Sequence, residues 1–491
     1  MATASATEVA PATTPMGARS ALRAALPGLG IVVGVAAAMR VVFSPWYGNY
    51  DVRYALLWAR DLWQGHTPEY KADFAPTPHP LSIAWSSIGL PFGDHADSVM
   101  VLLVLLAFGA LVWLTYKLGD ELFSRWVGAV AAAVVLTRPA IQRDALLGYQ
   151  DVPFAALIIG AVLLEARRPR RGTAVLVALG LAGLLRPEAW VLAGLYVLYL
   201  WPHTQPRERA RLVALAAAAP LLWALSDLLV TGDPLHSLHG TADLAEQAGR
   251  RRKVTQVPRW TAQYLAFTLR EPLMLGVPIG LVFAWLYRRR QAMLPMAVVV
   301  AMLAVFAVGP VFGLPLIGRY VRTPSVLLAL FYGLAVAGWM LLPEGRARRR
   351  WMGVGALALL LSLAFVPKHL TLEQGLHKRI ALDSAFYTSM RQVAQAPVVR
   401  QAFAACAPMS VADHRPLPYL RYWLNGAPGS VTTVEKRMSP EGRILVRPRH
   451  SRIAGRFYGV NFPTVRVPTG FVTIYKNSSW RVLAEPQCVS G

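Results

Sequence analysis

The chain contains few charged residues and almost no cysteine. Charged side chains make up 15% of its 491 residues, whereas soluble proteins carry about a quarter. Acidic residues are scarcest, with 26 Asp and Glu against 50 Lys and Arg, and Cys406 and Cys488 are the only cysteines. The sequence also lacks a P-loop, an HExxH motif, a cysteine-based metal motif and a Rossmann fingerprint. A large soluble core and an ATP-driven pump are therefore both unsupported.

Apolar stretches fill the region between Pro27 and Pro367 and predict a polytopic membrane protein. A transmembrane helix needs about 17–25 apolar residues, and hydrocarbon accepts only segments that satisfy their own backbone hydrogen bonds. We expect about eleven such helices. They lie near residues 21–43, 99–117, 126–140, 152–166, 173–186, 189–201, 212–230, 272–287, 292–313, 323–342 and 351–366.

Arginine runs between the apolar segments predict the orientation of the chain. They lie within residues 167–171, 207–211, 288–290 and 346–350, and the positive-inside rule places them in the cytoplasm. Residues 1–18 then form a disordered cytoplasmic tail and residues 19–369 a membrane domain. Much of the net charge of +24 lies in these runs, so we expect a bilayer and no nucleic acid as partner.

Residues 370–491 are predicted to form a small α/β domain outside the cytoplasm, because the odd number of crossings places them there. Helical patterns at residues 372–404 and in PLPYLRYWL alternate with the strand-like pieces VTTVE, GRILVRP and GFVTIYK. Both cysteines, Cys406 and Cys488, belong to this region. In an oxidising compartment they form a disulfide or remain free thiols, and the sequence leaves both outcomes open.

Two of the predicted outer connections, residues 44–98 and 231–271, are unusually long, as functional loops often are. The first contains an amphipathic stretch that predicts a helix at the membrane interface, with Trp58 and Trp63 at headgroup depth.

Two outer carboxylates are candidate catalytic groups. Asp51 follows the first apolar segment, where a half-desolvated acid can act as general base on a hydroxyl. The alternative is an acid that only stabilises a helix N-terminus. Asp151 begins the fourth segment, where an ionisable group is costly and marks a site or pairs with Arg143. Asp144 is expected in a loop, where its charge costs little.

Cations and their neighbours collect at the predicted outer ends of several segments and suggest an anion pocket. An arginine guanidinium suits phosphate because its planar donors bind two oxygens at once. Each residue alone has a simpler explanation as a snorkelling side chain or a turn ion pair. The candidates are Arg40, Arg186, Glu188, Arg319, Tyr320 and Arg322.

The second outer loop contributes possible ligand contacts. His236 and His239 are three residues apart, a spacing that puts both on one helix face, as in metal sites, although no third ligand is evident. The basic run ending at Lys253 suits anionic lipid or a donor phosphate. No cofactor is assigned, and a divalent metal stays open.

The chain resembles the GT-C superfamily of membrane glycosyltransferases. The likeness rests on Asp51 in the first outer loop, on ARDLWQGHTPEY (residues 59–70) and on PTPHPL (residues 76–81), with LLRPEAW and TGDPLHS as later landmarks. It spans roughly residues 20–340 and is strongest to actinobacterial cell-envelope arabinofuranosyl- and mannosyltransferases. This chain has Tyr50–Asp51 where those enzymes often carry a doubled acid, Leu57–Trp58 where they carry Arg-Tyr, and Asp151 in place of a Glu near Gly148.

The resemblance implies an inverting transfer of sugar from a polyprenyl-phosphate donor to a cell-envelope glycan or glycolipid at the outer face of the plasma membrane. Asp51 acts as general base. The donor phosphate and sugar contact His79, Asp151, Glu188, Tyr320 and the four candidate arginines Arg40, Arg186, Arg319 and Arg322. Two other readings are a transporter or flippase for a lipid-linked or anionic substrate, and an envelope scaffold without activity.

Overall fold

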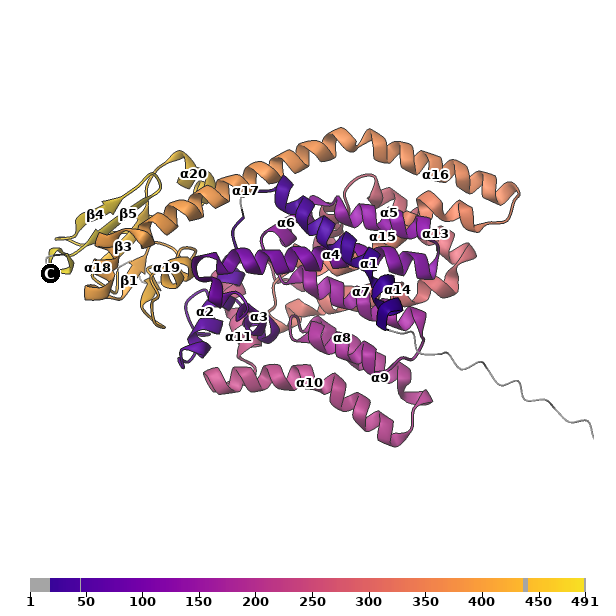
Figure 1. Ribbon diagram of the computed structural model, residues 1–491, viewed down its shortest axis with the longest axis horizontal. Coiled ribbons are helices and arrows are strands. Elements are labelled where there is room, and N and C mark those ends of the chain that lie inside the picture. Colours follow the sequence, from indigo (N-terminus) through magenta and orange to yellow (C-terminus); the bar gives the residue numbers. More distant parts are fainter. Residues whose placement is uncertain (1–17, 45, 436–439, 490–491) are drawn as a thin grey trace, which may run out of the picture.

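The computed structural model describes residues 18–44, 46–435 and 440–489, and it shows a helical bundle attached to a small α/β domain (Figure 1). The predicted tail, residues 1–18, lies outside the described residues except for Ala18, the first residue of α1. The long axis of the molecule runs along the bundle, with the α/β domain at one end (Figure 1). Every functional group considered below lies at or beyond that end of the bundle.

Each of the predicted apolar segments coincides with a helix of the bundle. These helices are α1 (Ala18–Val42), α4 (Ala96–Leu122), α5 (Arg125–Leu136), α7 (Asp151–Arg167), α8 (Thr173–Gly183), α9 (Glu188–Leu200), α10 (Pro206–Thr231), α13 (Leu273–Tyr287), α14 (Arg289–Val308), α15 (Arg322–Ala337) and α16 (Arg346–Ala364). Four described helical stretches are each long and apolar enough to span a bilayer, and three bent helix pairs raise the number to seven. Three shorter apolar helices accompany them, so the number of crossings stays a prediction.

Helix α15 lies at the centre of the bundle, in contact with α5, α7, α13 and α14. Nearly all its side chains are buried, from Arg322 at its start to Ala337 at its end. Close helix approach depends on glycine: a Cβ atom at Gly280 of α13 would overlap the carbonyl oxygen of Phe331 in α15. Without a hydrophobic drive between helices in lipid, such close packing is a main source of association.

Short helices cover the end of the bundle that faces the α/β domain. They are α2 (Tyr50–Trp63), α3 (Pro80–Ser86), η1 (Leu90–His95), α6 (Pro139–Leu146), α11 (His236–Gln247), η3 (Val254–Gln256), α12 (Val257–Leu269), η4 (Gly309–Phe312) and η5 (Gly318–Val321). Helix α6 meets α7 at 115°, and the η3–α12 segment meets α13 at 99°. At the opposite end lies the connection from α9 to α10, which contains η2 (Trp201–His203) (Figure 1). The segment η6 (Gly338–Leu341) lies at the same end.

The structure corrects the prediction that α2 lies on the membrane interface. Ten consecutive residues of α2, from Val52 to Asp61, are buried, and Trp58 is only 1% exposed. Trp58 packs against Tyr54 and Tyr70, in a hydrophobic core shared with the α/β domain. Trp63 at the end of the helix is exposed. Helix α2 is therefore an internal layer between the bundle and the α/β domain.

The α/β domain is reached through α17 (Val366–Gln395), a long helix that continues from α16 after a bend of 44°. The predicted boundary at residue 370 falls inside this helix. The domain contains α18 (Pro397–Cys406), β1 (Met409–Val411), α19 (Leu417–Trp423), β2 (Val431–Thr433), β3 (Ile444–Pro448), α20 (Arg452–Tyr458), η7 (Gly459–Asn461), β4 (Val472–Lys476), β5 (Trp480–Ala484) and η8 (Pro486–Cys488).

The strands form one sheet in the order β2-β1-β3-β5-β4. Strand β1 is parallel to both β2 and β3, whereas β5 is antiparallel to β3 and β4. The carboxyl ends of β1 and β2 therefore meet at one edge of the sheet. Trp480 of β5 is fully buried against Phe386 of α17, which fixes the domain on that helix.

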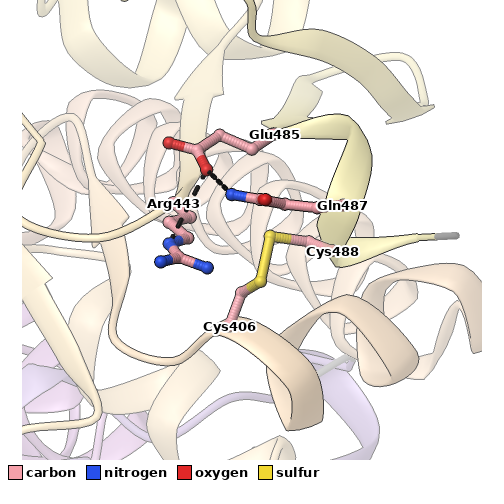
Figure 2. The surroundings of a disulfide bond; sticks show 5 residues. All are labelled: Cys406, Arg443, Glu485, Gln487 and Cys488. Atoms are coloured by element: carbon pink, nitrogen blue, oxygen red, sulfur yellow. Dashed lines mark hydrogen bonds and ion pairs between the residues drawn. A yellow bond between two sulfur atoms is a disulfide. The ribbon is translucent and has the colours of Figure 1, made fainter. Parts of the chain in front are cut away.

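A disulfide joins Cys406 at the end of α18 to Cys488 in η8 (Figure 2). It closes a loop with a sequence separation of 82 residues and ties the C-terminal segment to the first helix of the domain proper. Arg443 and Gln487 both contact the carboxylate of Glu485 beside it (Figure 2). Of the two outcomes that the sequence left open, the structure shows the bridge.

Candidate active site

Helix starts place the acidic candidates together. Asp51, Asp151 and Glu188 each lie in the first turn of a helix, α2, α7 and α9 respectively. Carboxylates are favoured there by the positive end of the helix dipole. Asn49 caps α2, because its side chain accepts a hydrogen bond from the backbone N–H of Val52. The starts of α7 and α9 lie at the end of the bundle that α2 covers.

Arg319 connects two of these acids. It lies in η5, just before α15, and its Nη1 donates a hydrogen bond of 3.0 Å to Oδ2 of Asp51. The same nitrogen lies 3.5 Å from Oδ2 of Asp151. Arg186 pairs with the other oxygen of Asp151 and with the carboxylate of Glu188. Asp51, Arg319, Asp151, Arg186 and Glu188 form one continuous chain of ion pairs, which we call the acid–arginine cluster.

The cluster is open to solvent on one side only. The side chains of Asp51 and Arg319 are 25% and 24% exposed, whereas Asp151 and Arg186 are 3% and 7% exposed. A substrate that approaches from outside therefore meets Asp51 and Arg319 first. Asp151 and Arg186 form the buried floor of the site.

Two tyrosines hold the arginines in place. The guanidinium of Arg319 lies 4.5 Å from the ring centre of Tyr149, and that of Arg186 lies 4.4 Å from the ring centre of Tyr320. Such stacking favours a planar cation that has lost part of its water. Tyr320 was among the sequence candidates, but Tyr149 was not. Its position two residues before Asp151 was the one available signal.

His79 is a neutral neighbour of the cluster. It precedes α3, with its ring edge-on to Trp223 of α10 at 5.3 Å. Burial lowers the pKa of the His79 imidazole to about 3, and the nearby Arg186 guanidinium acts in the same direction. Its Nδ1 has no hydrogen-bond partner among the described residues. The imidazole is therefore an uncharged hydrogen-bonding group beside the cluster.

Arg322 and Asp144 form a separate buried pair, which corrects the prediction that Asp144 lies in a loop. Asp144 is not in a loop: it lies in α6, is 1% exposed, and accepts a hydrogen bond of 2.8 Å from Nε of Arg322. Arg322 also donates to the hydroxyl of Thr268 in α12. With these partners in the protein interior, Arg322 joins α6, α12 and α15. Its ion pair is with Asp144 and not with a carboxylate of the acid–arginine cluster.

Arg40 is not part of the cluster either. It is exposed near the end of α1, and its guanidinium lies over the ring of Trp46 at 4.2 Å. Asp151 does not pair with Arg143, which instead lies 3.7 Å from Asp144. Because Arg40 lies outside the cluster, the anion pocket lacks one of the cations that the sequence suggested for it.

The candidates of the second long loop lie along a cleft. His236 and His239 belong to α11, and this helix and residues 70–78 enclose a cleft of about 310 Å³. His239 pairs with Asp233, and Nε2 of His236 lies 3.3 Å from the carbonyl oxygen of Tyr70. Across the described ranges, no three His, Cys, Asp or Glu side chains are grouped so as to hold a metal ion. Lys253 is exposed before η3 and outside the residues that line the cleft.

The charges of the cluster do not form the expected pocket of unpaired cations. Each of its two arginines already contacts carboxylates, and three carboxylates against two guanidinium groups leave one net negative charge. An anionic substrate group can bind here only if it displaces a carboxylate or if a carboxylate becomes protonated. This balance restricts the chemistry that the site can support.

Comparison with known proteins identifies the fold. No protein-family model and no curated protein matches the chain. ArnT from Cupriavidus metallidurans bound to undecaprenyl phosphate superposes with a TM-score of 0.58 at 13% identity, over 96% of this chain and 99% of ArnT. Apo ArnT gives a TM-score of 0.51 at 14% identity, over 95% of this chain and 99% of ArnT.

An archaeal protein shares the same architecture. The Archaeoglobus fulgidus oligosaccharyltransferase in complex with zinc and sulfate gives a TM-score of 0.51 at 14% identity, over 81% of this chain and 61% of that protein. ArnT and the oligosaccharyltransferase are polytopic glycosyltransferases of GT-C type. At these identities the likeness establishes the fold alone. The chain is therefore a polytopic, mainly helical membrane protein with the GT-C fold and a small C-terminal α/β domain.

Proposed function

We propose that this protein is a membrane glycosyltransferase that moves a sugar from a polyprenyl-phosphate donor to a hydroxyl of a cell-envelope glycan or glycolipid. The observation that carries the proposal is the acid–arginine cluster, in which a partly exposed carboxylate, Asp51, touches a partly exposed guanidinium, Arg319, at 3.0 Å. The GT-C fold and its occurrence in a protein solved with undecaprenyl phosphate support the lipid-linked donor.

In this proposal Asp51 is the general base. The acceptor hydroxyl attacks the anomeric carbon of the donor, and its proton passes to Asp51 as the new C–O bond forms. The bond between the anomeric carbon and the phosphate oxygen breaks at the same time, so the configuration inverts. The oxygen of the base must lie within about 2.6–3.2 Å of the hydroxyl oxygen whose proton it accepts. Because Asp51 is the more exposed of the two aspartates, it can meet a hydroxyl directly.

Arg319 links proton transfer to departure of the phosphate. Before the reaction its guanidinium is shared between Asp51 and Asp151. When Asp51 takes up the proton it becomes neutral, and its attraction for Arg319 weakens. At the same moment the leaving polyprenyl phosphate gains negative charge and can take the place of Asp51 beside Arg319. Stabilisation of developing charge by a positioned cation is often the largest contribution to catalysis.

The remaining residues of the site act on binding and orientation. Asp151 holds Arg186 and Arg319 from below, and Tyr320 and Tyr149 keep the two guanidinium planes fixed. His79 offers a neutral hydrogen-bonding group to the donor sugar or phosphate. The polyprenyl chain lies in the bilayer beside the bundle, with its head at the end covered by α2. In this proposal the arginine runs at the opposite end face the cytoplasm, and the site and the α/β domain lie outside, as the positive-inside rule favours.

A divalent metal enters no step of this scheme. The carboxylates of the cluster are engaged with arginines, and the described residues contain no suitable group of three ligands. The guanidinium groups are the charges that stabilise the phosphate. We propose further that the second long loop contacts the substrate through His236, His239 and Lys253.

The test is a transfer assay with the purified full chain in detergent. The donors are polyprenyl phosphates carrying radiolabelled mannose or, separately, radiolabelled arabinofuranose, and the acceptor is a cell-envelope extract. Asp51→Asn should lower the rate by about 10²–10⁴-fold, as expected for loss of a general base. Asp120→Asn is the matched control, because Asp120 pairs with Lys117 near the opposite end of α4.

The transporter reading makes a different prediction in the same assay. A transporter or flippase moves its substrate unchanged and leaves no glycosylated product, and a scaffold is equally silent. If Asp51→Asn transfers sugar as fast as the wild type does, Asp51 is not the general base. No product from either donor, with any tested acceptor fraction, would contradict the transferase itself.

A further inference from the structure

A second pocket lies in the α/β domain, apart from the acid–arginine cluster. It has a volume of about 300 Å³ and opens where the parallel strands β1 and β2 end. We call it the strand-end pocket. Its polar lining comes from Asp413 and Arg415 after β1, Glu435 after β2, and Asn461 and Thr464 after α20. In α/β sheets, ligands bind in crevices outside the carboxyl ends of the strands.

Asp413 is the buried acid of this pocket. It is 5% exposed, and its Oδ1 accepts a hydrogen bond of 2.8 Å from the backbone N–H of Arg415. The Tyr458 hydroxyl lies beside the same carboxylate and interacts with it. The two oxygens of a carboxylate together accept about four hydrogen bonds, so this buried acid can still accept from a ligand hydroxyl.

The other polar side chains of the pocket are held in position from outside it. Glu435 accepts hydrogen bonds from the backbone N–H and Nδ1 of His414 at 2.9 and 2.7 Å, and all its hydrogen bonds with described residues use Oε2. The guanidinium of Arg415 lies over the rings of Phe457 and Tyr458. Both groups are therefore preorganised.

The pocket is adjacent to the entrance of the active site. The ring of His414, between the two pocket residues Asp413 and Arg415, stacks on Phe74 at 4.5 Å and meets Tyr50 edge-on at 5.5 Å. Tyr50 immediately precedes Asp51 and donates a hydrogen bond to the carbonyl oxygen of Phe74. Phe74 itself lines the cleft beside α11. The stacked rings of His414 and Phe74 thus lie between the strand-end pocket and the cleft beside α11.

We propose that the strand-end pocket binds a neutral saccharide unit of the acceptor, several units away from the hydroxyl that reacts. Two carboxylates accept hydrogen bonds from sugar hydroxyls, and the guanidinium and amide donate to sugar oxygens. The excess of carboxylates disfavours a phosphate or another anion. A volume of about 300 Å³ is at the lower end of small-molecule pockets and suits one or two sugar rings. This inference rests on the proposed function, and it makes the acceptor a glycan chain rather than a compact lipid.

The test measures binding separately from transfer. The purified full chain with its disulfide intact is titrated with four neutral linear tetrasaccharides, of mannose, arabinofuranose, galactose and glucose, and followed by saturation-transfer-difference NMR. We expect at least one to bind. Thr464→Trp should weaken that binding at least tenfold, because Thr464 is exposed on the rim and a larger side chain there fills the pocket. Thr469→Trp is the matched control, exposed in the same segment but outside the lining.

Asp413→Asn tests the buried carboxylate and should also weaken binding about tenfold, since a hydrogen bond to a charged acceptor is among the stronger ones. Binding is measured without a donor, so failure of the assigned base in the transfer assay does not imitate failure of the pocket. The proposal is overturned if none of the four tetrasaccharides binds, or if Thr464→Trp binds as tightly as Thr469→Trp.

Discussion

Arg421 of the α/β domain and Asp61 of α2 are joined by two hydrogen bonds of 2.7 Å although they lie 360 residues apart in sequence. Nη2 of Arg421 donates to both carboxylate oxygens, and both side chains are fully buried. Arg60 adds hydrogen bonds of 3.0 and 2.9 Å to the carbonyl oxygens of Tyr422 and Gly426. The α/β domain therefore holds α2, the helix that carries Asp51 in its first turn.

Arg421→Ala is expected to destabilise the protein and to slow transfer. Removal of one partner leaves the buried charge of Asp61 uncompensated, which costs about 3–5 kcal/mol. Release of α2 also loosens the position of Asp51. Thermal unfolding of the purified protein and the transfer assay measure the two effects. Arg443→Ala is the control, because Arg443 and Glu485 form an exposed pair worth about 1 kcal/mol or less.

The double variant Asp61→Leu/Arg421→Met distinguishes anchoring from charge burial. Apolar residues of similar size often replace a buried ion pair without loss of stability. We expect the double variant to unfold at a higher temperature than Arg421→Ala. Equal unfolding temperatures in the two variants would contradict the assignment of Asp61 as the uncompensated charge.

Arg319→Gln should reduce the transfer rate by about 10²-fold or more while the protein remains folded, because the leaving phosphate loses its positioned cation. Arg319→Lys keeps the charge but not the planar donors, so it should recover only part of the loss. The rate constant under saturating donor is the quantity to measure. Arg259→Gln, an exposed change in α12, serves as control. Unchanged turnover in Arg319→Gln would refute the role of Arg319 in phosphate departure.

The Asp144–Arg322 pair predicts a different signature, because it is structural. Asp144→Asn should lower stability by about 3–5 kcal/mol, since Arg322 is left buried with a weakened partner. The transfer rate per folded molecule should fall far less than in Arg319→Gln. Unfolding temperature and turnover are compared in the same preparations. A stable Asp144→Asn protein with lost activity would instead place this pair in the chemistry.

His79 predicts a pH dependence of stability. Its pKa in the folded protein is about 3, against an ordinary value of 6.5. Below pH 6.5 the unfolded chain binds a proton at His79 and the folded protein does not, so stability is complete above pH 6.5 and falls as the pH drops towards 3. The loss is about 1.4 kcal/mol for each pH unit within this window. His79→Asn should remove this part of the dependence, as measured by unfolding temperatures at pH 7.5 and 5.5.

Local sequence was sufficient for the helices of the bundle and for the acids of the site. Apolar runs marked the helices because each must satisfy its own backbone in lipid. Asp51, Asp151 and Glu188 stood out because a charge beside an apolar run is rare. Arg319 was recognisable for the same reason. Arg40 and Arg322 looked identical to Arg319 in sequence, since position beside an apolar run does not reveal which partner a side chain meets.

The partners of the charged residues depend on how distant segments pack. Asp144 was expected to be solvated, but the turn at α6 brings it under Arg322, 178 residues later. Trp58 was expected at a lipid surface, but α3 and α19 pack against the helix that contains it. The one sequence signal at Tyr149 was its position two residues before Asp151, and this position does not reveal that its ring meets Arg319. Hydropathy cannot separate burial by lipid from burial by protein, which explains the error at α2.

By itself, the amino-acid sequence determined that this protein spans a membrane and which ends of the apolar helices carry the arginine runs. It also determined that rare carboxylates and guanidinium groups flank these helices. These properties follow from the cost of transferring charge and unpaired backbone into hydrocarbon, a cost that each segment bears alone. Only the tertiary structure decided that Arg319 joins Asp51 to Asp151 and that Arg322 pairs with the buried Asp144. It also decided that the α/β domain is hydrogen-bonded to α2. Ion pairs between remote residues form through packing of the whole bundle, and short-range sequence patterns contain no record of it.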